Sequence, residues 1–265
     1  MNLWTITLIS FFLFQSHHTL GCELINKKTI SLSGPVSTYF DQLGIINQVE
    51  AISIYHPIAD YQGEKLAGGL YLSTSSLKKL EGKTVYFDKS RELKKILNRY
   101  PKIKAIEVDS RRKTPQEVIE LVASLTSKTL KGCEQQISEF KNRLALLEKD
   151  ITSNISKIKQ SIFFLGKIGA KLPETVISND GFVYWLKKEN LLQSYDSHLE
   201  YLTWSMKVLS PLRGKYYFFG VQDSYQNGEK SIKKVSEKKY NVKYPGALTP
   251  GYTQLEFLKF LLNYF

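Results

Sequence analysis

The sequence has few of the residues that enzymes and metal centres use. Beyond the first 22 residues only His56 and His198 remain, and neither has a second histidine or a cysteine within four positions. A zinc site needs three or four ligands, usually with close spacing between some of them. The glycine patterns of nucleotide-binding loops and of hydrolase nucleophile turns are also missing. We therefore expect no resident metal, no cofactor and no enzymatic activity.

Long apolar runs are almost absent, and the single exception lies at the start of the chain. Residues 3–14 have the length of the hydrophobic segment of a signal peptide and are too short to cross a bilayer comfortably. We expect residues 1–22 to be a leader and the mature protein to be periplasmic. The leader carries no charged side chain, so the net charge of +12 belongs to the remainder. Such a charge suits anionic small molecules, membranes or nucleic acid, but the scattered lysines lack a nucleic-acid-binding pattern, and we expect no nucleic acid.

Cysteine is scarce as well, since only Cys22 and Cys133 are present. Gly21 followed by Cys22 resembles the end of a bacterial lipoprotein signal, in which the cysteine is acylated and becomes the first mature residue. Two or more acyl chains would anchor the protein firmly to a membrane. We expect lipidation of Cys22, with Cys133 as a small buried residue. A disulfide between the two cysteines in an oxidising compartment, or two unpaired thiols, remain as alternatives.

A regular apolar pattern occupies the middle of the chain. Its spacing of three or four residues predicts one face of a helix over residues 132–160. On both sides of it, short apolar runs alternate with amphipathic segments, which favours parallel sheets covered by helices. We predict an α/β protein of two Rossmann-like lobes, residues 23–131 and 161–265, whose parallel sheets are joined by one long α-helix. The pattern consists of Ile137, Phe140, Leu144, Leu147, Ile151, Ile155 and Ile158.

Several segments within the lobes carry local signals. Thr114 followed by Pro115 is typical of a helix start, and we expect that helix to reach about residue 128. We expect a polar loop over residues 58–69 and a helix over residues 199–209, and residues 223–240 are polar and lysine-rich.

Polar and aromatic residues follow many of the predicted strands. In open α/β sheets, ligands bind beyond the carboxyl ends of the strands, and aromatic walls with a few polar groups suit a bulky small molecule. Taken singly, each of these residues is equally typical of a turn, a cap or a packed core. Together the candidate ligand-binding residues are Ser33, Pro35, Tyr55, His56, Tyr71, Asp88, Asn179, Asp180, Trp204, Gln222 and Tyr252.

The order of the segments is similar to that of the class III periplasmic substrate-binding proteins, which take cobalamin or ferric siderophores to ABC importers. The resemblance covers nearly all of the chain after the leader. It implies a monomeric receptor that captures a metal chelate between two lobes and delivers it to an ABC permease. The matching segments are residues 31–35, 43–44, 52–57, 68–87, 106–126, 162–166 and 250–256.

The chain departs from this family at two positions. In importer-coupled members, a glutamate on each lobe contacts arginines of the permease. The corresponding positions fall near Ser75 and Ser205 here, and neither residue is acidic. This departure keeps a second hypothesis open, in which a degenerate binding-protein fold serves as an interaction or scaffold protein of the cell envelope.

Overall fold

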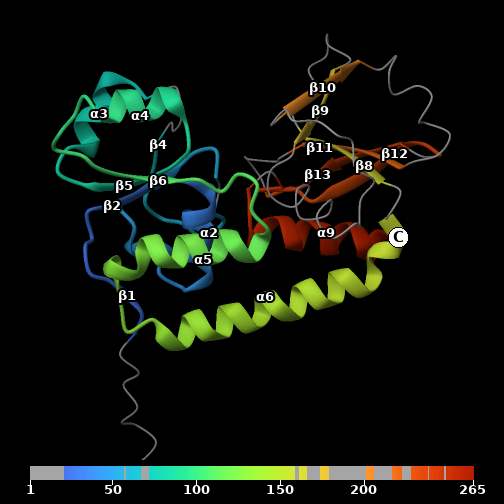
Figure 1. Ribbon diagram of the computed structural model, residues 1–265, viewed down its shortest axis with the longest axis horizontal. Helices are drawn as coiled ribbons and strands as arrows, with labels where there is room; N and C mark the ends of the chain where they lie inside the picture. The colour runs from blue at the N-terminus through green and yellow to red at the C-terminus, as the bar shows by residue number, and fades with distance from the viewer. Residues whose placement is uncertain are drawn as a thin grey trace, which may run out of the picture.

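Two α/β lobes lie side by side over a pair of long helices, α6 (Glu134–Asn154) and α9 (Tyr252–Tyr264) (Figure 1). This architecture is seen in a computed structural model of the chain. The structure describes residues 21–56, 58–66, 72–158, 161–165, 174–178, 201–205, 217–222, 228–237, 239–247 and 249–265.

The first lobe is built on five parallel strands in the spatial order β4-β3-β2-β5-β6. Chain order runs outward in one direction from β2 through β3 to β4, and then in the other direction through β5 to β6. The order in which the chain adds strands therefore reverses between β2 and β5, although all five strands run parallel. The strands are β2 (Thr29–Leu32), β3 (Ala51–Ser53), β4 (Glu64–Leu66), β5 (Thr84–Asp88) and β6 (Lys104–Val108).

Helices cover both faces of this sheet, because its strands are apolar on both sides. Along β5, Val85 and Phe87 pack into one core and Tyr86 into the other. Figure 1 shows α2 (Gly34–Gln42) and α5 (Pro115–Thr126) on one face, and α3 (Thr74–Leu80) and α4 (Arg91–Leu97) on the opposite face. Short 3-10 turns follow α2 and α5, η1 (Ile46–Gln48) and η3 (Ser127–Thr129).

The predicted start of α5 is confirmed. The hydroxyl of Thr114 accepts a hydrogen bond from the Glu117 amide at 3.2 Å, and the Glu117 carboxylate accepts one from the Thr114 amide at 2.6 Å. With Pro115 in the first turn, this is a complete capping box, which satisfies two backbone donors that the helix leaves unpaired.

The second lobe contains a four-stranded sheet in the order β12-β13-β11-β8 and a separate pair, β9 (Glu174–Ser178) with β10 (Tyr201–Ser205). Strand β11 (Tyr217–Gln222) runs parallel to β8 (Ser161–Leu165) and β13 (Lys239–Lys243). Strand β12 (Ser231–Ser236) is antiparallel to β13, and β9 is antiparallel to β10. The α/β class is confirmed, but the second lobe is mixed rather than wholly parallel.

Two local predictions were wrong, and both concern strands. Strand β4 lies within the predicted loop over residues 58–69. The β12–β13 hairpin includes part of the lysine-rich segment, for which no element was predicted. Strand β10 replaces part of the helix predicted over residues 199–209. Its sequence, Tyr-Leu-Thr-Trp-Ser, is rich in residues that favour strands, and pairing with β9 decides its conformation.

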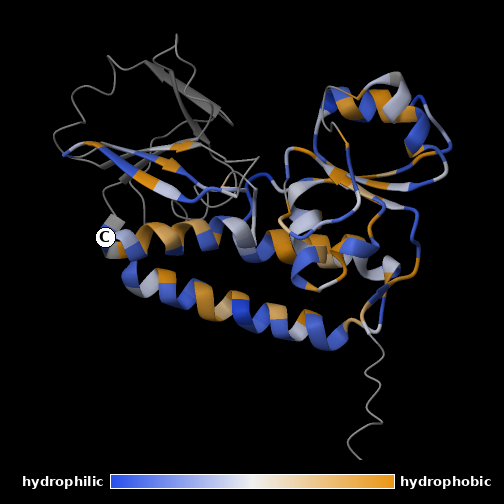
Figure 2. Cartoon of the chain, turned by 180° about the vertical axis from the view of Figure 1, so that it is seen from behind, coloured by the Kyte–Doolittle hydropathy of each residue, from blue (hydrophilic) through white to orange (hydrophobic). Residues whose placement is uncertain are grey.

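Helix α6 runs beneath both lobes, as the apolar pattern predicted, and spans about 32 Å at 1.5 Å per residue. It is shorter than expected, because a 3-10 turn, η4 (Ile155–Ile158), follows it. Phe140, Leu144 and Ile151 are its buried residues, and Figure 2 shows apolar and polar residues alternating along α6 where it lies beside α9. Within the part of the chain that the structure describes, no helix is both long and apolar enough to span a bilayer.

The expectation that Cys22 carries a lipid is corrected by the structure, in which Cys22 and Cys133 form a disulfide. A sulfur atom in a disulfide has no valence left for a thioether-linked lipid. The bond joins β1 (Glu23–Leu24) and β7 (Leu130–Lys131), which pair antiparallel. The backbone of Cys22 and Leu24 is also held by the Gln48 side chain, at 3.2 and 2.8 Å.

Candidate functional site

The candidate site lies at the carboxyl ends of the first-lobe strands, which point toward the second lobe (Figure 1). The centre of this edge is the space beyond β2 and β5, where the strand order reverses. At such a reversal the loops from neighbouring strands diverge to opposite faces of the sheet and leave room for a ligand.

Asp88, the last residue of β5, joins three elements at this point. Its carboxylate accepts hydrogen bonds from the Ser33 hydroxyl at 2.6 Å and from the Gly34 amide at 3.3 Å. The Nε2 atom of His56 lies 3.4 Å from the same carboxylate. Because Gly34 is the first residue of α2, Asp88 places a negative charge at the positive end of that helix, where such a charge is stabilised. The Asp88 side chain is 39% exposed, so its remaining surface faces solvent.

His56 depends on Gly34 for its position. A Cβ atom added at Gly34 would lie 2.8 Å from Nδ1 of His56 and 2.8 Å from Cγ2 of Thr249. The imidazole therefore occupies space that any other residue at position 34 would need. Its Nδ1 atom is buried and has no hydrogen-bond partner within the described part of the chain.

Ser33 and Pro35 hold the start of α2 rather than presenting surface. Both are buried, and the Ser33 side chain is bonded to Asp88. A second buried hydroxyl pair lies behind them: Ser37 contacts the Ser31 hydroxyl at 2.8 Å, and Ser31 donates to the Ser33 carbonyl at 3.0 Å. This arrangement makes Ser33 and Pro35 supports for Asp88, and their contact with a ligand stays a prediction.

The end of β3 is apolar and accessible. Ile54 and Tyr55 follow this strand, with 40% and 39% of their surface exposed. Their turn is fixed by hydrogen bonds to Ser53, from the Tyr55 amide to its hydroxyl at 3.2 Å and from the His56 amide to its carbonyl at 3.1 Å. Tyr55 therefore lies beside the Asp88–His56 pair, as predicted for a residue that follows a strand.

The opposite end of the edge is cationic, which the sequence analysis did not identify. Asp109 follows β6 and binds Lys89, which follows β5, and also the Nε atom of Arg111 at 3.1 Å. Burial alone would raise the pKa of Asp109, but the hydrogen bonds from Lys89 and Arg111 outweigh it and lower that pKa below its usual value. Arg112 and Lys113 follow directly. The signal available in the sequence was the run Arg-Arg-Lys, which begins three residues after the end of a predicted strand.

Tyr252 does not follow a strand of the first lobe, and its predicted role as a wall of the site stays a prediction. It is the first residue of α9, and its ring meets the Phe140 ring of α6 edge to face at a centroid distance of 5.2 Å. Burial raises the pKa of its hydroxyl to about 12. Tyr252 is partly buried and packs against the core that α6 and α9 share.

Five predicted site residues remain, and three of them fall on residues that the structure does not describe. Tyr71, Asn179 and Asp180 lie outside the described residues. Trp204 and Gln222 belong to β10 and β11, and their roles stay predictions. Among the described residues, no group of three or more histidine, cysteine or acidic side chains is arranged to hold a metal ion.

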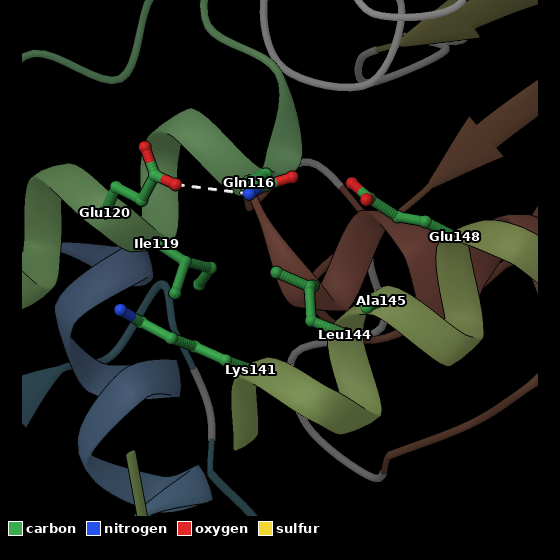
Figure 3. Close-up of a pocket in the computed structure, with 7 residues that line it drawn as sticks. All are labelled: Gln116, Ile119, Glu120, Lys141, Leu144, Ala145 and Glu148. Carbon is green, nitrogen blue, oxygen red and sulfur yellow. Dashed lines mark hydrogen bonds between the residues drawn. The ribbon is translucent and has the colours of Figure 1, made fainter. Parts of the chain in front are cut away.

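A small pocket lies between α5 and α6, away from the strand ends (Figure 3). Its volume of about 70 Å³ holds only a few water molecules. Gln116 and Glu120 lie on its rim, hydrogen-bonded to each other at 3.1 Å, and Ile119 and Leu144 form its floor. Its size excludes it as the site of a bulky ligand.

Comparisons with known proteins match the chain in structure only, since no family profile and no curated sequence matches it. The periplasmic heme-binding protein HutB of Vibrio cholerae matches with a TM-score of 0.62 and 15% identity, over 89% of this chain and 97% of that one. The periplasmic vitamin B12-binding protein BtuF of Vibrio cholerae matches with a TM-score of 0.57 and 15% identity, over 89% of this chain and 95% of that one. The siderophore-binding protein FhuD of Vibrio cholerae, bound to Fe3+-Desferal, matches with a TM-score of 0.55 and 11% identity, over 88% of this chain and 97% of that one. The chain therefore has the fold of the class III periplasmic binding proteins, as the order of its segments predicted.

Proposed function

We propose that this protein is a periplasmic receptor that captures a metal chelate, such as cobalamin or a ferric siderophore, between its two lobes for an ABC importer. The observation that carries the proposal is the strand-end edge around Asp88, His56 and Tyr55, which points toward the second lobe. Solved structures of this fold are named as binding proteins for heme, vitamin B12 and a ferric siderophore, which supports a chelate as the ligand class.

The chemistry of the edge favours binding without covalent catalysis. A serine nucleophile needs a base within hydrogen-bond reach of its hydroxyl. Ser33 donates instead to Asp88, and His56 contacts Asp88 on the carboxylate's other oxygen. The serine and the histidine are thus separated by the carboxylate, and Ser33 is fully buried.

The disulfide supports an exported protein. Disulfides persist in oxidising compartments such as the periplasm and are rare in the cytosol. With the Cys22 sulfur engaged, membrane attachment through that cysteine is not part of the proposal, and we infer that the receptor reaches its importer by diffusion.

The scaffold hypothesis keeps one specific support, the missing acidic residue on the first lobe. Ser75 is exposed on the first turn of α3, a helix that carries Lys78 and Lys79 in its last turn. In the second lobe, Ser205 lies directly across the β9–β10 pair from Glu174. A scaffold protein would show no saturable binding of any chelate, so one experiment separates the two functions.

That experiment is a titration of the purified protein with cyanocobalamin, hemin and ferric siderophores, followed by quenching of its tryptophan fluorescence. We expect saturable quenching by at least one of them. The variant Tyr55→Ser should weaken this binding, while Tyr264→Ser, at a residue that is 50% exposed near the end of α9, should not. Absence of quenching by every chelate would contradict transport and favour the scaffold function.

A further inference from the structure

The net positive charge of the first lobe belongs to one segment, which contains α3, β5, α4 and the turns after the two helices. Residues 72–104 hold ten lysines and arginines and three carboxylates, a net charge of +7. The other described residues of the lobe, 23–56, 58–66 and 105–131, have a combined net charge of −1. The charge of this lobe is therefore concentrated in the segment and is not an even coating of lysines.

Both helices of this segment hold their basic side chains away from the sheet. Two leucines of each helix are buried in one core cluster against the sheet: Leu77, Leu80, Leu93 and Leu97. The opposite sides of α3 and α4 therefore face solvent, and Figure 1 shows both helices on the side of the sheet away from α6. We call the exposed basic residues of the two helices and their turns the basic face. They are Lys78, Lys79, Arg91, Lys94, Lys95, Arg99 and Lys102.

Carboxylates offset only part of the charge of the basic face. Glu81 and Glu92 are exposed within the same segment. Two lysines of the face are also paired with carboxylates of neighbouring strands, Lys79 with β4 and Lys94 with β6. The paired carboxylates are Glu64 and, at 2.6 Å, Glu107. When all four carboxylates are counted against the seven cations, a surplus of three positive charges remains.

Helix stability does not account for the order of these charges. Arg91 is the first residue of α4, where the helix dipole disfavours a positive charge. Lys95 follows four positions later on the same side of the helix, and like charges at this spacing repel each other. Arg99 continues the row in the turn after α4. The row therefore lowers local stability, and a negatively charged surface against it would remove that cost.

The composition of the basic face fits a lipid surface better than a protein or a nucleic acid. Protein interfaces centre on apolar and aromatic side chains, but the exposed large apolar residues in the described part of the chain all lie outside residues 72–104. Ile96 and Tyr100 pack against the core, so neither is an exposed ring on which a base could stack. Five of the seven cations are lysines, which act as point charges and suit the diffuse charge of anionic headgroups.

The disulfide gives such a contact a purpose. With the sulfur of Cys22 bonded to Cys133, an acyl chain on that atom cannot hold the protein at a membrane. Basic side chains near an anionic bilayer attract it without a covalent lipid. We infer that the basic face attaches this protein reversibly to an anionic membrane surface. The inference goes beyond the proposed function and does not depend on which ligand the protein binds.

Two triple variants with the same net charge test the inference. The face variant replaces three lysines of the basic face that lie outside the Glu64 and Glu107 pairs: Lys78→Gln, Lys95→Gln and Lys102→Gln. The control variant replaces three exposed lysines of α6 and the turn after it, on the opposite side of the lobe: Lys141→Gln, Lys149→Gln and Lys157→Gln. Cosedimentation measures binding to vesicles of phosphatidylcholine alone and of phosphatidylcholine with roughly one-third phosphatidylglycerol. Urea unfolding checks that both variants remain folded.

We expect the wild-type protein to bind the phosphatidylglycerol vesicles at low salt, and to bind them more weakly as salt screens the charges. Each lysine near an anionic bilayer contributes about fivefold to the affinity. The face variant should therefore bind roughly 30- to 100-fold more weakly than wild type. The control variant should stay within about threefold, because its lysines lie on the far side of the lobe, beyond the Debye length.

The outcomes separate this inference from its alternatives. Absence of wild-type binding, equal binding to vesicles of phosphatidylcholine alone, or equal losses in the two variants would overturn it. Binding of polyglutamate through the basic face, without binding of the vesicles, would also overturn it and would assign the face to an acidic protein surface. Chelate titration keeps the proposed function apart: a protein that binds the vesicles but no chelate would lose the receptor function and keep the membrane contact.

Discussion

Removal of the Cys22–Cys133 disulfide should destabilise the first lobe strongly. The same experiments test whether Cys22 forms this disulfide or carries a lipid. The two cysteines are 111 positions apart. In the chain-entropy description, a cross-link that closes a loop of this length lowers the entropy of the unfolded chain by an amount equivalent to about 4.8 kcal/mol at room temperature. Native disulfides in secreted domains typically contribute about 2–5 kcal/mol, so we expect a loss of about 3–5 kcal/mol.

The change to make is Cys22→Ser together with Cys133→Ser, so that neither cysteine is left as a free thiol. Urea unfolding of the double variant and of the oxidised wild-type protein, followed by circular dichroism, measures the difference. With a denaturant dependence of about 3 kcal/mol per molar urea, the midpoint should fall by roughly 1–1.7 M. A reducing agent should lower the wild-type midpoint by a similar amount and leave that of the double variant unchanged, which serves as the control.

Mass spectrometry of non-reduced peptides gives the direct test of the bond. We expect one linked pair of peptides that contains Cys22 and Cys133 and separates on reduction. A diacylglyceryl group on Cys22, or unfolding midpoints that agree within experimental error, would refute the reasoning. The N-terminal segment would then be held by the short β1–β7 ladder, the Gln48 hydrogen bonds and the packing of Leu24 in the core.

Three further predictions concern single residues of the first lobe. Tyr39→Phe should be neutral or stabilising by up to about 1 kcal/mol, because the buried Tyr39 hydroxyl lacks a hydrogen-bond partner in the described part of the chain. The matched variant Tyr86→Phe loses a hydrogen bond at 3.3 Å to Thr129 and should cost about 1 kcal/mol in urea unfolding; the reverse order would contradict the geometry. Gly34→Ala should destabilise by roughly 1–3 kcal/mol and weaken chelate binding, because its Cβ would displace His56; unchanged binding would show that the imidazole position is unimportant. Burial raises the pKa of Tyr39 to about 12, above the value near 10 of the unfolded chain. The stability linked to the neutral Tyr39 hydroxyl is therefore complete below about pH 10 and is lost as the pH rises toward 12. At about pH 11 the free energy of unfolding should have fallen less in Tyr39→Phe than in wild type.

Local signals in the sequence were enough to place several elements and part of the candidate site. The Thr114, Pro115 and Glu117 pattern determines a helix start within four residues, because each capping contact is made between near neighbours. The apolar spacing around Phe140 determines a helix with one buried face. Asp88 and His56 were identifiable because they directly follow predicted strands, and parallel strands bring their carboxyl ends to one edge.

Other features depended on contacts between distant parts of the chain, and the sequence alone left them open or misplaced them. Two cysteines 111 positions apart pair because β1 lies beside β7, and no local pattern specifies that neighbour. Tyr252 meets Phe140 because the apolar faces of α6 and α9 cover each other. The Lys89–Asp109–Arg111 group likewise depends on strand pairing: β5 and β6 must lie side by side before Lys89 and Arg111 can share Asp109. Short-range sterics and hydrogen bonding thus decided the elements, whereas burial and strand pairing decided which residues meet.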